Sequence, residues 1–73
     1  MMAGRFDFKI SLAAARKNAG LTQDEVSKQL KISNKTLGNW ENGNTDIPFS
    51  ALYRLCDMYA VPLDAISLQQ KST

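Results

Sequence analysis

Small hydrogen-bonding side chains are concentrated between residues 33 and 43, around the single tryptophan of the chain. On a helix over this segment, Asn34, Lys35 and Asn39 fall at i, i+1 and i+5 and share one stripe of the surface. An asparagine amide both donates and accepts hydrogen bonds, and a lysine ammonium donates them. Such groups suit planar polar partners, and adenine and guanine present matching edges in the major groove of DNA. The stripe therefore predicts a surface that binds a planar polar partner.

The other face of the same segment is apolar. Leu37 and Trp40 are three residues apart, so we expect both to point into the core. Asparagine is a poor helix former, and Gly38 costs about 1 kcal/mol relative to alanine inside a helix. A helix kept only for solubility more usually carries glutamate and lysine on its outer face. The outer stripe is interpreted as a binding surface, and a solvated asparagine-rich face is the alternative.

The segment before it predicts a helix that meets the first at a steep angle. Thr22 followed by Glu25 is a capping box, and this helix runs to Lys31. Ser33 can cap the next helix, which Gly43 ends, so only a few residues separate the two. Two helices joined so closely form a helix-turn-helix, in which the second helix enters the groove.

Positive charge and helix-end donors surround this pair of helices. Gln23 lies in the first turn of the earlier helix, where backbone N–H groups can meet a phosphate. Lys28, Lys31 and Lys35 supply counter-charge for a polyanion.

The remaining segments also have helical spacing. Phe8, Leu12, Ala15 and Ala19 predict a first helix, which Gly20 ends in a left-handed cap. A fourth helix is predicted over 48–60 and a short fifth over 62–68, each opened by a proline. No run alternates as a strand does. The wide apolar face of the fourth helix is expected to carry Phe49, Leu52, Leu55, Cys56 and Tyr59.

The expected fold class is all-α, a compact bundle of five short helices with a helix-turn-helix at about 22–41. We expect an N-terminal arm over 1–7, a DNA-binding domain over 8–68 and a frayed tail over 69–73.

Composition excludes several classes of site. The 73 residues allow one domain, and they include no histidine and one cysteine. Internal disulfides, Cys/His zinc sites and Cys-His or Ser-His-Asp catalysis are thereby excluded. We predict no enzyme activity, no cofactor and no metal, and we expect Cys56 to be an inert buried thiol. Without a signal-peptide core or membrane span, we expect a cytoplasmic protein. The net charge of +2 supports nucleic-acid binding only weakly.

The central run of the chain resembles a known family. Residues 20–44 read GLTQDEVSKQLKISNKTLGNWENGN, and they resemble the helix-turn-helix of the lambda-repressor/Cro-like (XRE) DNA-binding proteins. Arg16 upstream and LCDMYAVPLDAI downstream also match, so the resemblance covers residues 8–68. Ser27 and Lys31 depart from it, because the family usually has alanine and glycine there. Lys31 must then adopt a left-handed or distorted conformation.

The resemblance implies a role for individual residues. Arg16 and Glu41 match a structural ion pair between the first helix and the end of the third. Positions that face bases or adjacent backbone are Ser33, Asn34, Lys35, Gly38 and Asn39. Phosphate-contacting positions are Gln23, Asn42, Gly43, Asn44 and Thr45, and we add Lys28 to them because of its charge.

Together these features predict a sequence-specific, double-stranded-DNA-binding transcriptional regulator that acts as a repressor. Tyr53, Met58, Ile66 and Leu68 exceed what so small a core holds, so we predict an isologous homodimer through residues near 53–68. Scattered surface apolar residues are the alternative reading of those four. The alternative function is a helix-bundle module that binds a protein partner, as an adaptor, anti-repressor or antitoxin.

Overall fold

The computed structural model describes residues 9–68. The predicted arm (1–7), the predicted tail (69–73) and Phe8 lie outside the described residues. Within 9–68 the order is β1 (Ile10–Ser11), α1 (Leu12–Asn18), α2 (Gln23–Leu30), α3 (Asn34–Asn42), α4 (Phe49–Tyr59), a 3₁₀ turn (Leu63–Ala65) and β2 (Ile66–Ser67).

Local side chains define where each of the first three helices begins. The Ser11 hydroxyl accepts from the Ala14 N–H, so α1 starts at Leu12 rather than near residue 8 as predicted. Thr22 and Glu25 form the predicted capping box at α2. The Ser33 hydroxyl accepts from the Thr36 N–H, as predicted for α3.

Left-handed residues end the later helices. Gly43 has φ 75° after α3, and Lys31 has φ 61° after α2. The prediction that Lys31 takes the conformation usual for glycine is therefore confirmed. Ala60 also has a positive φ, 57°, after α4.

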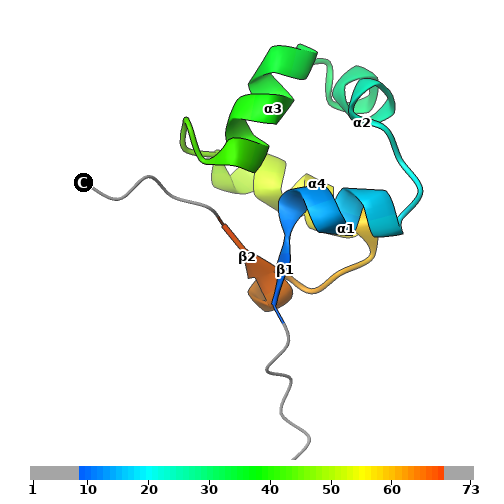
Figure 1. Ribbon diagram of the computed structural model, residues 1–73, viewed down its shortest axis with the longest axis vertical. Coiled ribbons are helices and arrows are strands. Elements are labelled where there is room, and N and C mark those ends of the chain that lie inside the picture. Colours follow the sequence, from blue (N-terminus) through cyan, green and yellow to red (C-terminus); the bar gives the residue numbers. More distant parts are fainter. Residues whose placement is uncertain (1–8, 69–73) are drawn as a thin grey trace, which may run out of the picture.

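A parallel strand pair replaces the predicted fifth helix. Ile10 pairs with Ile66 and Ser11 with Ser67, at the bottom of the view in Figure 1. The prediction of five helices without strands is thus corrected to four α-helices and a small strand pair within 9–68. The segment after Pro62 closes one 3₁₀ turn, and Ile66 then buries its β-branched side chain against β1.

The core lies where the four helices meet. α1 packs against α4, α2 packs against α3, and Figure 1 shows α2 and α3 together at one end of the molecule. Val26, Leu37 and Leu55 are completely buried. Trp40 is half-buried and packs against this core, in agreement with its predicted inward position.

The prediction that Phe49 on α4 belongs to the core is wrong. Leu55, Cys56 and Tyr59 are buried, but Phe49 is 67% exposed. Phe49 is the first residue of α4, and helical spacing alone does not determine whether another element covers a side chain there.

Candidate nucleic-acid interface

The outer face of α3 presents the predicted polar stripe. Asn34 and Lys35 in its first turn and Asn42 in its last turn are exposed, whereas Gly38 and Asn39 are half-buried. Ser33 is exposed, but its hydroxyl caps the helix and lies 3.0 Å from the Thr36 hydroxyl. The structure thus places the five predicted base-facing residues along one segment formed by the turn and α3. Both contacts of the Ser33 hydroxyl are made with Thr36, at the start of the helix.

Asn39 has a partner that the sequence did not reveal. Its Oδ1 accepts a hydrogen bond of 3.4 Å from Nδ2 of Asn44, across the end of α3. This contact uses the acceptor end of the Asn39 amide. The hydrogen bond is long and exposed, so a base edge can replace it at little cost.

Two backbone N–H groups at the end of α3 donate hydrogen bonds within the helix cap. The Gly43 N–H donates to the Trp40 carbonyl at 3.2 Å, and the Asn44 N–H donates to the Asn39 carbonyl at 2.9 Å. This is the glycine-centred helix cap in which two N–H groups satisfy terminal carbonyls. Those two N–H groups are thus already paired within the helix cap, whereas the side chains of Asn42, Asn44 and Thr45 are exposed.

A buried network connects α1, α2 and α3. Arg16 Nε lies 2.8 Å from Glu41 Oε2, and Arg16 Nη1 donates to the Leu21 carbonyl at 3.0 Å. Both charged side chains are less than one-tenth exposed. Glu41 Oε1 also accepts from Gln23 Nε2 at 2.9 Å. The ion pair implied by the family resemblance is present, and the Gln23 contact is an addition to it that no sequence signal indicated.

The lysines of α2 lie away from this network. Lys28 Nζ is 3.4 Å from Asp24 Oδ2 in an exposed i, i+4 pair. Lys28 and Lys31, together with Leu21 and Met58, are among the residues that line a shallow groove of about 550 Å³. Such an exposed ion pair is weak, so Lys28 can exchange Asp24 for a phosphate readily.

Comparison with known families agrees with this geometry. A family model described as helix-turn-helix matches residues 12–66, which covers most of the chain. The chain belongs to the lambda-repressor/Cro-like, XRE-type helix-turn-helix family. No curated protein gives a significant match to the sequence. XRE-type domains are DNA-binding regulatory domains rather than enzymes, so this chain is a DNA-binding regulator of the XRE type whose partner is double-stranded DNA.

Three further observations concern the part of this XRE-type domain that the structure describes. No helix in residues 9–68 has the length and hydropathy needed to cross a bilayer. Over the same residues, no three metal-ligating side chains come together. Cys56 is buried, and desolvation raises the pKa of its thiol.

Proposed function

We propose that this XRE-type domain is a sequence-specific repressor that reads the major groove with α3. The observation that carries the proposal is the outer stripe of α3, where Asn34, Lys35 and Asn39 share a face while Leu37 and Trp40 pack into the core on the opposite side. Asparagine amides suit adenine, and lysine suits guanine. A helix held to α1 by a buried ion pair between Arg16 and Glu41 can present these groups without first being ordered.

Phosphate contacts position the helix in the groove. Gln23 at the start of α2 and Asn42, Asn44 and Thr45 after α3 lie at the two ends of the helix-turn-helix. Contacts at both ends define register and orientation, while the base-facing residues between them carry the sequence preference. Repression follows from occupancy, because a bound domain of this kind excludes other proteins from the same DNA.

The charge distribution predicts that the affinity for DNA depends moderately, rather than strongly, on salt concentration. Lys28, Lys31 and Lys35 are the exposed cations of the helix-turn-helix. Three neutralised phosphates predict a slope of about −3 for the logarithm of affinity against the logarithm of salt concentration.

Selection from random duplexes tests the proposal directly. The purified protein is incubated with a pool of duplexes that contain a randomised central region, and the bound molecules are amplified and sequenced. We expect a recurrent motif, and a reporter promoter that overlaps this motif should lose activity when the protein is expressed. Enrichment without any recurrent motif would contradict sequence-specific reading.

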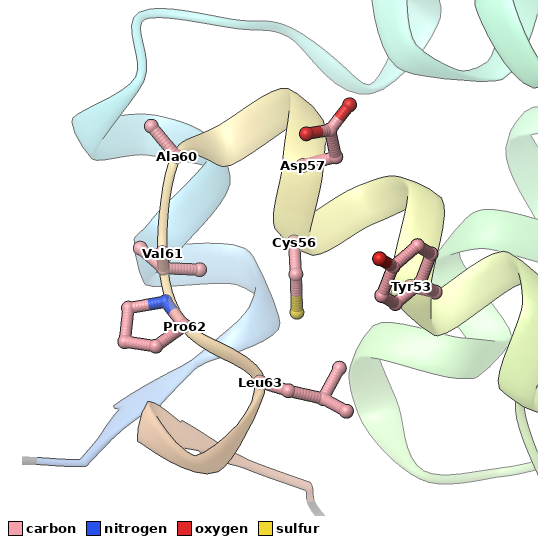
Figure 2. A pocket seen from close by; sticks show the side chains of 7 residues that line it. All are labelled: Tyr53, Cys56, Asp57, Ala60, Val61, Pro62 and Leu63. Atoms are coloured by element: carbon pink, nitrogen blue, oxygen red, sulfur yellow. The ribbon is translucent and has the colours of Figure 1, made fainter.

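We also propose that the domain forms an isologous homodimer through the outer face of α4. Phe49 and Tyr53 are 67% and 64% exposed, and their rings stack with centroids 6.4 Å apart. This aromatic pair adjoins a pocket of about 300 Å³ that Tyr53, Pro62 and Leu63 help to line, and Figure 2 shows the Cys56 sulfur directed into it. In an isologous dimer, the aromatic pair of each protomer can enter the pocket of the other protomer.

Only part of the apolar set considered for the proposed dimer is exposed. Ile66 is buried in the core, and Met58 and Leu68 are partly covered by it. Of the four apolar residues that suggested a dimer in the sequence, only Tyr53 is exposed. Phe49, which lies beside it, is also exposed and is added to the proposed dimer surface.

Sedimentation of wild type and of a Phe49→Ser/Tyr53→Ser variant tests the dimer. We expect wild type to dimerise at micromolar concentration and on DNA with two half-sites, and the variant to remain monomeric. A wild-type monomer at high micromolar concentration, both free and on DNA, would overturn the dimer and leave the aromatic pair as a surface for a different protein.

A further inference from the structure

The amide of Gln23 lies between the two helices of the helix-turn-helix, where its orientation is restricted. Its Nε2 donates to Glu41 Oε1 at 2.9 Å in a partly buried contact. Glu41 is itself held by Arg16, whose Nε lies 2.8 Å from the other carboxylate oxygen. The Gln23 side chain is therefore linked to α3 through Glu41 and, through Arg16, to α1, and it is not free at the surface.

The chemistry of the partner decides which way the amide faces. An ionised carboxylate only accepts hydrogen bonds, so Glu41 requires the Nε2 end of the amide and excludes the Oε1 end. The Nε2 group carries two N–H donors, and its hydrogen bond to Glu41 uses one of them. The second N–H has no acceptor among residues 9–68 and remains beside the first turn of α2. A phosphate oxygen needs a donor of this kind.

Gly38 provides the space for this arrangement. A Cβ at position 38 would lie 3.8 Å from Gln23 Nε2, which is ordinary van der Waals contact. Alanine therefore fits, but the further atoms of a longer side chain pointing the same way would compete with the amide. The glycine that the sequence suggested as a groove-facing position thus has a second role, as the neighbour that leaves room for Gln23.

We infer that Glu41 is a positioning residue for DNA binding, which holds the Gln23 amide with one N–H directed outward to a backbone phosphate. This inference rests on the proposed function, since it needs a duplex bound at the start of α2. Glu41 does not touch the DNA, and it acts through Gln23. The ion pair with Arg16 keeps the carboxylate in place, so one buried charge both joins three helices and orients one phosphate contact.

A double-mutant cycle on DNA affinity separates this role from a purely structural one. Gln23→Met keeps the length of the side chain and removes its donor. Glu41→Asp keeps the charge that Arg16 needs and withdraws the carboxylate by one methylene. The probe is a fluorescent 20-base-pair random-sequence duplex at low salt, because a phosphate contact does not depend on sequence. Circular dichroism at the same temperature establishes that each variant is folded.

The cycle has a defined expected result. Gln23→Met should weaken binding about fivefold, the factor that corresponds to one hydrogen bond. Glu41→Asp should produce a similar loss alone but less than a twofold loss when Gln23 is already methionine. Gln29→Met, the same substitution at an exposed position of α2, should leave the affinity unchanged.

Other outcomes have different meanings. If Glu41→Asp weakens binding equally in both backgrounds, Glu41 is structural only and the inference is overturned. If Gln23→Met has no effect while Lys35→Ala weakens binding, the inference fails but DNA binding stands. If wild type binds no duplex better than a Lys35→Ala/Asn39→Ala variant does, the proposed function fails as well.

Nuclear magnetic resonance of the free protein gives a readout that needs no DNA. One Nε2 proton of Gln23 should lie further downfield than the corresponding proton of the exposed Gln29 amide and should exchange with water more slowly. Glu41→Asp should bring the shift and the exchange rate of that proton close to those of Gln29, whose own resonances stay unchanged. Equivalent exchange of both Gln23 protons in wild type would contradict the orientation by Glu41.

Discussion

Arg16 Nε lies 2.8 Å from Glu41 Oε2, and this contact joins α1 to α3 at a site from which water is nearly excluded. Removing one partner of a buried ion pair leaves a charge without compensation, which costs about 3–5 kcal/mol. We expect Arg16→Met to lower the free energy of unfolding by that amount, as measured by urea denaturation. The double variant Arg16→Met/Glu41→Leu should recover most of the loss, because it leaves no buried charge. A double variant as unstable as the single one would contradict this account.

Ser27 should be a position where a simple substitution stabilises the domain. It is 2% exposed, and its hydroxyl has no hydrogen-bond partner within residues 9–68. A buried unpaired hydroxyl costs about 1–3 kcal/mol, and alanine also favours a helix. Ser27→Ala should therefore raise the free energy of unfolding by about 1–2 kcal/mol. Ser50→Ala, at an exposed position of α4, measures the contribution of helix preference, and an equal gain at both sites would refute the burial argument.

Tyr59 should make the domain sensitive to alkali. The pKa of Tyr59 is raised from 10.0 to about 12, chiefly by burial; the Glu41 carboxylate contributes to the rise, and Arg16 opposes it. Between those values the unfolded chain loses the phenol proton and the folded chain retains it, so stability falls as the pH rises. The loss attributable to Tyr59 should reach about 2–3 kcal/mol by pH 12.

Tyr59→Phe should remove this part of the alkaline loss, as measured by urea denaturation at pH 8 and pH 11. It should also stabilise the domain at pH 8, because the Tyr59 hydroxyl is buried without a partner in the described part of the chain. Tyr53→Phe, on the exposed face of α4, is the matched control. If Tyr59→Phe and Tyr53→Phe change the pH dependence of the unfolding free energy equally, Tyr59 is not the source of the alkaline loss.

Gly38→Ala should stabilise α3 without weakening the contact to phosphate. Alanine is about 1 kcal/mol more favourable than glycine in a helix interior, and the new Cβ meets Gln23 Nε2 at 3.8 Å without overlap. Thermal unfolding should therefore shift upward while affinity for a random duplex stays within twofold. A marked loss of affinity would indicate that the α3 backbone at Gly38 approaches the DNA too closely to admit a methyl group.

Local signals in the sequence predicted much of the fold. Thr22, Ser33 and Gly43 each act on groups within a few residues of themselves, so their caps could be located without a structure. The ion pair of Arg16 with Glu41 came from the resemblance to the XRE family, because 25 residues separate the two.

Features that depend on distant segments could not be predicted in this way. β1 and β2 have two residues each and meet across the length of the domain, so neither has room for an alternating pattern. Phe49 has the spacing of a core residue, but whether a partner covers it depends on where α4 lies. The Gln23 contact with Glu41 requires α2 and α3 to cross at one angle, which helical periodicity does not contain.

The central claim is that α3 reads sequence, and one comparison tests it most directly. Wild type and Asn39→Ala are each titrated with the selected duplex and with a scrambled duplex of equal length. We predict that Asn39→Ala loses about 1–3 kcal/mol on the selected duplex and almost nothing on the scrambled one, with relaxed preference at one or two base pairs. Gln23→Met should instead weaken both duplexes by the same factor. Equal losses on both duplexes for Asn39→Ala would contradict the assignment of α3 as the reading helix.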